Sequence, residues 1–217
     1  LIVTNTFAKE QFNFDITNIE ITENGNLIKG LNKGIIKTDN GVTIISESFV
    51  YNKIQNILTA NGGVEIFDSK KNIKLFANSI IYKKKLEVFN ASGNVKFLNN
   101  ENNIQIYTEN AIYEKNNETI KTENNSKAIY QDDKIITAKI FNHDIKNNIL
   151  KASGDVRAEN KVKETVLKAE KISYFKNENK ITTNGKTFYD FQSKYKGETE
   201  NLVYLLNKNY LSSDYKT

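Results

Sequence analysis

The 217-residue sequence contains no cysteine, proline, methionine or tryptophan, and it has one histidine. Without cysteine, the chain can form no disulfide framework, no thiolate nucleophile and no cysteine-based zinc site. The single histidine, His143, leaves a Ser-His triad or a zinc hydrolase centre with almost no support. Because Asn, Lys and Ile are abundant, the missing residue types indicate drift toward AT-rich codons, and the excess of Asn and Lys is mostly genomic.

The sequence also lacks an apolar run long enough to cross a membrane as a helix. Hydrophobic residues make up 38% of the chain and the mean hydropathy is -0.57, yet the many Ile, Phe, Tyr, Val and Leu residues exclude a disordered composition. The net charge of +5 is compatible with nucleic acid, anionic lipid or acidic sugar and selects none of them. The tightest basic run, Lys83-Lys84-Lys85, is predicted to be a solvated turn.

The first residues, LIVTNTFAKEQ, resemble the end of a signal peptide. Small residues at Thr6 and Ala8 fit cleavage before Lys9. We therefore expect residues 1–8 to be a signal-peptide remnant and residues 9–217 to be one exported domain. The alternative is an ordinary first strand.

Tyrosine recurs about every 31 residues, each time with an apolar residue seven positions later, which indicates an internal repeat. The pairs are Tyr51–Leu58, Tyr82–Phe89, Tyr113–Ile120, Tyr174–Ile181 and Tyr204–Leu211, with His143–Leu150 in the one gap. A small residue stands five positions before each anchor, an apolar residue stands two before it, and most copies have glycine eleven after it. About six repeats follow from this spacing, the first being divergent. Because YLSSDYKT stops inside a predicted strand, the domain is expected to continue beyond the sequence.

Each repeat is predicted to contain two antiparallel strands joined by polar turns, because apolar and polar residues alternate with a period of two. In the second strand, as in FNASGNVKF (Phe89 to Phe97), small residues share the inner face with apolar ones, and Gly93 lies in the middle. The small residues leave room either for a ligand or for a bend, and the pattern does not separate these uses. The sequence therefore predicts an all-β, antiparallel fold.

No arrangement of residues typical of an enzyme is found. His143 occupies the tyrosine column of its repeat, which favours a structural role. Carboxylates recur four residues before the anchors and are predicted to be a surface feature: Glu47, Glu109, Glu170 and Glu200. A phosphate-binding loop and a calcium loop are absent from the sequence, and the aromatic residues do not interleave with basic ones as in RNA-binding sheets. We expect no enzymatic activity, no cofactor, no metal and no nucleic-acid partner.

Two-strand units with one apolar face cannot bury that face alone. The sheet can coil into a closed β-solenoid with a filled interior, or it can fold over as an open V with an apolar groove. The repeated small positions favour the groove, and such a groove suits acyl chains.

The same columns resemble the OstA-like periplasmic module of the lipopolysaccharide transport proteins LptA, LptC and LptD. The matching segments are ANSIIY…FNASGNV, AKIFNH…LKASGDV, AEKISY…ITTNGKT and SESFVY…LTANGGV, and the resemblance runs from about Phe12 to the end. It implies a β-taco or β-jellyroll whose V-shaped interior carries lipid A chains across the periplasm of a Gram-negative bacterium. It also implies that the partners are lipopolysaccharide, other OstA-like modules joined by edge-strand addition, and an outer-membrane barrel or its partner lipoprotein.

The resemblance, carried over column by column, assigns the inward apolar residues to the lipid-binding groove. For each of them, plain core packing is the alternative. The middle copy departs from the pattern at Asn124, Ser126 and His143, which predicts a locally irregular groove. The groove residues are Phe49, Tyr51, Leu58, Val64, Ile66, Ile80, Tyr82, Phe89, Val95, Phe97, Tyr113, Ile120, Phe141, Leu150, Val156, Ile172, Tyr174 and Ile181.

Within the family, the opening FNFDITNIEITENGN is most similar to the start of the N-terminal periplasmic domain of LptD. A free-standing, LptA-like periplasmic bridge is the near alternative, and LptC is disfavoured because it would begin with a retained membrane helix. A secreted β-solenoid adhesin or carbohydrate-binding protein with a filled interior is the alternative from another class.

Overall fold

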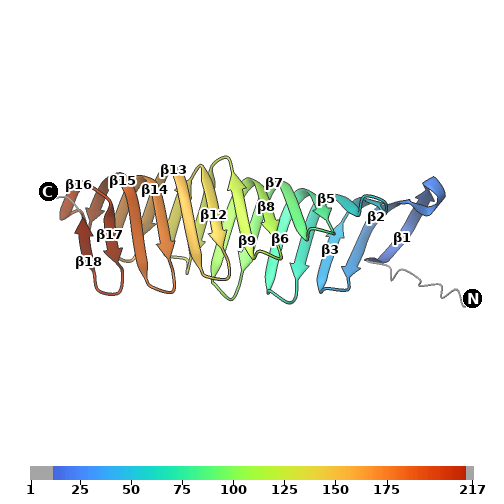
Figure 1. Cartoon of the computed structure of the whole chain (residues 1–217), viewed down its shortest axis with the longest axis horizontal. Coiled ribbons are helices and arrows are strands. Elements are labelled where there is room, and N and C mark those ends of the chain that lie inside the picture. Colours follow the sequence, from blue (N-terminus) through green and yellow to red (C-terminus); the bar gives the residue numbers. More distant parts are fainter. Residues whose placement is uncertain (1–11, 214–217) are drawn as a thin grey trace, which may run out of the picture.

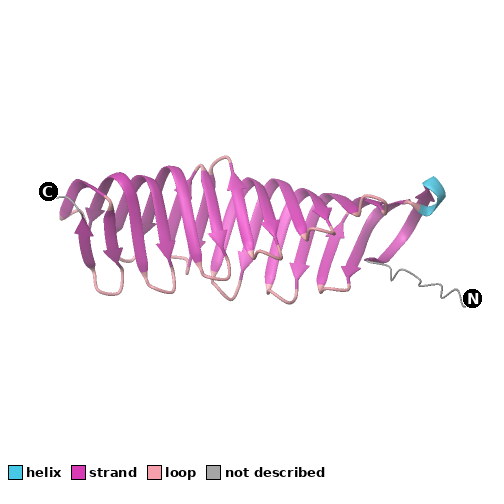
Figure 2. Cartoon of the chain, in the orientation of Figure 1, coloured by secondary structure: helices cyan, strands magenta, loops and turns pink. Residues whose placement is uncertain are grey.

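The computed structural model describes residues 12–213, so the predicted signal-peptide remnant lies outside the described residues. Within this range the chain forms one sheet of eighteen strands, and every pairing is antiparallel. The molecule is elongated, and its two ends lie at opposite ends of the long axis (Figure 1). A single turn of 3-10 helix, Glu23–Gly25, is the only helical element of the described part (Figure 2). The all-β, antiparallel prediction is confirmed. No helix in this range has the length and apolar character of a membrane span.

The strands follow one another along the sheet in chain order. Long strands pair with their sequence neighbours, and where two short strands replace a long one, each pairs separately with the next long strand, as β3 and β4 both do with β5. Their bounds are β1 (Phe12–Thr22), β2 (Leu27–Thr38), β3 (Val42–Ser46), β4 (Ser48–Asn52), β5 (Ile57–Asp68), β6 (Ile73–Lys83), β7 (Val88–Asn99), β8 (Ile104–Glu114), β9 (Thr119–Glu123), β10 (Ser126–Tyr130), β11 (Lys134–Ala138), β12 (Ile140–Asp144), β13 (Ile149–Asn160), β14 (Thr165–Phe175), β15 (Lys180–Phe191), β16 (Tyr195–Glu200), β17 (Leu202–Leu205) and β18 (Tyr210–Ser213).

The sheet is folded along a line that crosses the middle of every long strand. In β7, pairing with β8 is interrupted between Ser92 and Val95, and β5 and β13 are interrupted at the same place in their repeats. Elsewhere the interruption divides the strand into two, as in β9 and β10 or β11 and β12. The fold line creates two walls. We call wall A the strand halves that carry the repeated tyrosines, and wall B the halves on the other side of the bend.

The glycines in the middle of the second strands make this bend. Gly93 has φ of +76° and Asn94 has φ of +51°, a left-handed pair that turns the strand from wall A into wall B. A side chain at Gly93 would strike Asn78, which is an exposed residue. Gly93 therefore does not lie on the inner face, contrary to the expectation from the sequence. Asn124, with φ of +63°, takes the glycine's place in the middle copy, because asparagine tolerates the left-handed region better than most residues. The bend, and not room for a ligand, explains the glycine column.

The rows of small residues on the inner face lie directly beside the bend. Ala60 pairs with Ile80 on wall A, and Ala77 pairs with Val64 on wall B, so small and large side chains alternate across neighbouring strands. Both alanines are buried, with 1% and 5% of their surface exposed. The two walls converge at the fold line, so large side chains in every row would not fit there. Larger residues occupy the positions further from the bend.

Two of the bends are stabilised by threonine hydroxyl groups. Where the bend divides a strand, Thr122 Oγ1 accepts the backbone N–H of Phe141 at 3.0 Å and a hydrogen bond from Ser126 Oγ at 2.6 Å. Thr183 Oγ1 accepts the N–H of Leu202 in the same way, at 3.0 Å. Regular copies have alanine and valine at the positions of Thr122 and Ser126. Ser126, one of the departures noted in the middle copy, therefore forms a polar cap on the strand break together with Thr122.

Candidate functional site

All eighteen residues that were assigned to a groove are buried between the two walls. Their exposed fractions range from 0% for Leu58 to 8% for Ile181. Period-two alternation therefore identified which side chains point inward. Their contact with lipid stays a prediction, because an inward position is shared by core residues and groove residues alike.

Aromatic rings from both walls fill the interior of the N-terminal part, residues 12–130. The Tyr82 and Phe89 rings stack with centroids 4.0 Å apart, and the Phe89 and Tyr113 centroids are 5.8 Å apart. Phe97 of wall B approaches Tyr113 of wall A, with centroids 5.9 Å apart. Phe12 meets the Tyr51 ring edge-on at 4.6 Å. We call these six residues the aromatic core. Their rings contact one another along wall A and between the walls, which contributes to the stability of this part of the interior.

The free edges of the two walls are rows of turns, and polar side chains join one row to the other. Asn40 Nδ2 donates to Glu87 Oε2 at 2.7 Å across this opening, and Lys71 Nζ lies 2.5 Å from Glu118 Oε1. Lys84 supports this contact from the same turn as Glu87, with which it pairs at 2.6 Å, and it keeps only 9% of its side chain exposed. The prediction of a fully solvated lysine run is therefore wrong for Lys84. We call this row of contacts the polar seam.

One ion pair of the polar seam is buried. Lys115 Nζ lies 3.2 Å from Asp68 Oδ2, with 8% and 1% of the side chains exposed, and it also donates to the Asn40 carbonyl at 3.2 Å. The Tyr113 hydroxyl donates to the same Asp68 oxygen at 3.3 Å. Burial, followed by the charge of Asp68, raises the pKa of Tyr113 far above its usual range, so the phenol stays neutral. The seam and the aromatic core together hold the N-terminal part closed.

In the C-terminal part, residues 134–213, the lysine side chains of the polar seam donate to neutral acceptors. Lys176 Nζ donates to the Asn102 carbonyl at 2.6 Å. Lys163 Nζ donates to the Leu206 carbonyl and, at 2.9 Å, to Asn209 Oδ1. Within residues 12–213, Lys163 has no carboxylate within ion-pair distance, whereas Lys71 on an equivalent turn is paired with Glu118.

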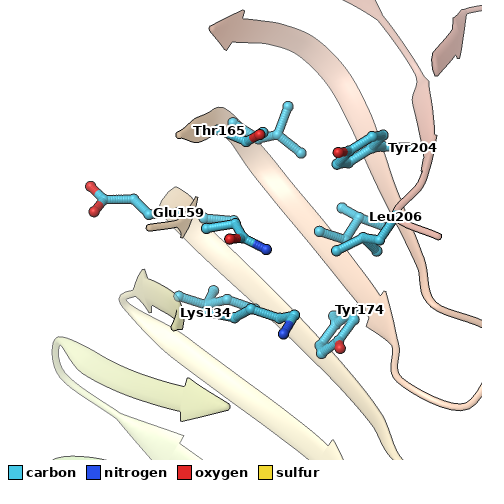
Figure 3. Close-up of a pocket in the computed structure, with 11 residues that line it drawn as sticks. Lys134, Glu159, Thr165, Tyr174, Tyr204 and Leu206 are labelled. Atoms are coloured by element: carbon cyan, nitrogen blue, oxygen red, sulfur yellow. The ribbon is translucent and has the colours of Figure 1, made fainter. Parts of the chain in front are cut away.

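Two apolar cavities lie between the walls in the C-terminal part. The smaller has a volume of about 20 Å³, enough for one water molecule. Tyr174, Tyr204 and Leu206 line it from wall A and its turn, opposite Thr165 and Lys134 of wall B, and the carboxylate of Glu159 points away (Figure 3).

The larger cavity, which we call the end pocket, has a volume of about 390 Å³ and opens to the outside at the C-terminal end of the interior. Thr165 and Tyr204 line both cavities, so the two are adjacent. The end pocket is lined by Lys163, Thr165, Tyr189, Phe191, Gln192, Tyr195, Tyr204, Asn209 and Leu211.

Of the predicted groove residues, Tyr174 and Ile181 line the smaller cavity, and none lines the end pocket. The prediction stopped at Ile181 and therefore missed Tyr189, Phe191 and Leu211. The signal was present, since Leu211 is the apolar partner of Tyr204 in the last repeat. Tyr189 and Phe191 follow the buried Thr187 at steps of two.

His143 occupies the interior position that tyrosine takes in the other repeats. The ring is 0% exposed, Nδ1 lies 3.2 Å from the Ile149 carbonyl oxygen, and burial lowers the pKa of the imidazole to about 4. It is therefore neutral near pH 7. No cluster of three potential metal-binding side chains is found among residues 12–213. The carboxylates that recur before the anchors are exposed, as predicted: Glu47, Glu109, Glu170 and Glu200.

The fold and its interior define a single antiparallel sheet folded over an apolar centre, which is the architecture of a β-taco or β-jellyroll. Among solved structures the chain is similar to LptH of Pseudomonas aeruginosa, described as the LptA homologous periplasmic component of the conserved lipopolysaccharide transport device. The sequence identity is 15% and the TM-score is 0.47, over 52% of this chain and 82% of the LptH chain. No family model and no curated protein matches the sequence.

Proposed function

We propose that this chain carries lipopolysaccharide across the periplasm and holds lipid A acyl chains between its two walls. The observation that carries the proposal is an apolar interior that runs between the walls and opens to the outside through the end pocket. The repeated columns that resemble the OstA-like module support the same function. Burial of acyl chains provides about 0.8 kcal/mol per CH₂, which is ample for binding.

The particular protein that we favour is the N-terminal periplasmic domain of an LptD-type assembly protein at the outer membrane, and a free-standing LptA-like bridge is the alternative. In either case we expect other modules of this kind to dock by strand addition at the edges of the sheet, next to β1 at one end and β16 and β18 at the other. An LptD-type chain would also meet an outer-membrane barrel or its partner lipoprotein. Directional movement of the lipid must then come from another protein.

A second candidate is a secreted β-solenoid adhesin or carbohydrate-binding protein with a filled interior. The aromatic core favours it, because the stacked rings of Tyr82, Phe89 and Tyr113 occupy the N-terminal part of the interior. On this alternative, the buried residues only pack and ligands bind outside.

Photo-crosslinking to purified lipopolysaccharide separates the two candidates. A benzophenone amino acid is placed at Ile80, Val95 or Tyr189, all of which face the interior, and at Ile81 as the matched control. Ile81 is the next residue to Ile80 but lies on the outer face, with 42% of its surface exposed against 1% for Ile80. Adducts at one or more of the inner positions and none at Ile81 are expected. Adducts at Ile81 alone, or at no position, would contradict lipid transport through the interior.

A further inference from the structure

We propose that the interior is functionally divided: an acyl chain is held in the end pocket with its anionic headgroup at Lys163, while the aromatic core stays packed. This inference rests on the proposed function, namely that the interior takes acyl chains. It adds the place along the protein where the acyl chain is held and the side chain that recognises the headgroup.

The end pocket has the dimensions and the lining of a ligand site. Its volume of about 390 Å³ falls within the range of roughly 300–1,000 Å³ that small-molecule pockets occupy. Tyr189, Phe191 and Leu211 pack against the core but are only partly buried, so they present apolar surface to an incoming chain. In the aromatic core, by contrast, Phe89 and Phe97 are completely buried. An acyl chain can therefore enter at the C-terminal end without displacing a packed side chain.

Lys163 supplies a cation at the rim of this apolar pocket. Its counterpart Lys71 reaches a carboxylate 47 residues further along the chain, Glu118. The residue that Lys163 reaches, 46 positions further along, is the neutral Asn209. Because no carboxylate of the described residues neutralises Lys163, a phosphate or carboxylate headgroup could pair with it while the acyl chain fills the pocket below. A charge-assisted hydrogen bond at such a half-buried site favours an anionic amphiphile over a neutral one.

Entry through the polar seam of the N-terminal part would break more contacts. An acyl chain bound between the walls of this part would have to separate Lys115 from Asp68 and Lys71 from Glu118. It would also have to separate the stacked rings of Tyr82 and Phe89. Nothing in the ligand would replace the buried ion pair that it breaks. The two halves of one repetitive interior therefore differ in what they can hold.

Amphiphile binding tests the headgroup assignment. Dodecanoic acid, dodecyl phosphate and dodecyl maltoside are compared by displacement of dansyl-labelled undecanoic acid. We expect Lys163→Met to weaken both anionic ligands about tenfold, to leave the maltoside unchanged, and to be rescued by Lys163→Arg. The carboxylate and phosphate arms show which headgroup is preferred. Equal losses for all three ligands, or the same loss in the control Lys71→Met, would overturn the role of Lys163.

The position of the acyl chain in the interior is tested with two substitutions that introduce a bulky side chain, one at each end of the protein. Leu211→Trp fills the end pocket, and Ile16→Trp places the same bulk at the opposite end, where Ile16 is also a partly buried residue packed against the core. Both variants are first checked for an unchanged circular-dichroism spectrum and melting temperature. Weaker binding of about tenfold or more in Leu211→Trp alone is the expected result. If Leu211→Trp fails to fold, the lysine variants still decide the proposal.

Crosslinks to lipopolysaccharide then distinguish failure of this inference from failure of the proposed function. Adducts at Tyr189 with few at Val95 support the divided interior. Strong adducts at Val95 and none at Tyr189 would reject it and would leave lipid transport intact. Absence of adducts at every inner position would reject both.

Discussion

Lys115 and Asp68 form an ion pair that joins the free edges of the two walls, with Nζ and Oδ2 3.2 Å apart and both side chains buried. The pair connects turns that are 47 residues apart in the sequence. Removing one partner of a buried pair leaves the other as an uncompensated charge, which typically destabilises a protein by about 3–5 kcal/mol.

We therefore expect Lys115→Met to lower the free energy of unfolding by about 3 kcal/mol or more, measured by urea denaturation. The double variant Lys115→Met with Asp68→Leu should lose less, because no buried charge remains. Lys139→Met is the control, since its partner Asp155 and Lys139 itself are exposed and the denaturation midpoint should not move. A double variant less stable than Lys115→Met would contradict the assignment.

The bend predicts different outcomes at two glycines that have the same backbone conformation. Gly93 has φ of +76° and Gly185 has φ of +80°, so alanine costs about 1–2 kcal/mol at either position. At Gly93 the new Cβ would also lie 2.5 Å from Asn78 Nδ2, whereas nothing lies within 4 Å of it at Gly185. Gly93→Ala should therefore be the less stable of the two variants in thermal melting. Equal melting temperatures would show that Asn78 moves away freely.

The repeat explains why so much of the fold could be predicted from the sequence. Alternation with a period of two identifies the side of the sheet on which each residue lies, and the residues from Phe49 to Ile181 assigned to the inside are all buried. The alternation does not indicate the distance between the walls, because that distance depends on contacts between turns, such as the contact of Asp68 with Lys115. In the sequence each of these turns looks like a solvated loop.

The end pocket was missed for a related reason. Tyr189 and Phe191 continue the inward alternation of β15, but they are only partly buried there. The alternation identifies these residues as inward-facing, but it does not indicate that they are only partly buried, since they are as apolar as the inward residues elsewhere. The glycine column left two uses open, and only the left-handed φ of residues such as Gly93 separates a bend from a space.

The buried imidazole of His143 predicts that stability falls on mild acidification. Its pKa is about 4 in the folded state and about 6.5 when unfolded, so between these values only the unfolded chain binds the proton. The free energy of unfolding should therefore fall by about 2 kcal/mol from pH 7 to pH 5. Nearby Lys176 also lowers this pKa, whereas the Ile149 carbonyl and Asp144 raise it.

The substitution His143→Tyr restores the residue of the other repeats and removes the titrating group. We expect its stability to change less than that of the natural protein over the same pH range, measured by urea denaturation at pH 7, 6 and 5. Measuring no lower than pH 5 limits the contribution of Glu114 and Asp144 to the pH dependence of stability, since the pKa values of both carboxyl groups are lowered. Parallel pH profiles for the two proteins would exclude His143 as the source.

The hydroxyl of Thr122 caps the break between β11 and β12, and its removal should destabilise the middle repeat. In Thr122→Ala, the buried N–H of Phe141 loses its acceptor, whereas the hydroxyl of Ser126 can still donate to Thr108 Oγ1 at 3.0 Å. An unsatisfied buried polar group costs about 1–3 kcal/mol, so a loss of this size is expected in urea denaturation. Thr122→Ser keeps the hydroxyl and should recover most of the loss, whereas Thr122→Val keeps the volume and should not. A valine variant as stable as the serine variant would show that packing, and not the hydrogen bond to Phe141, holds this bend.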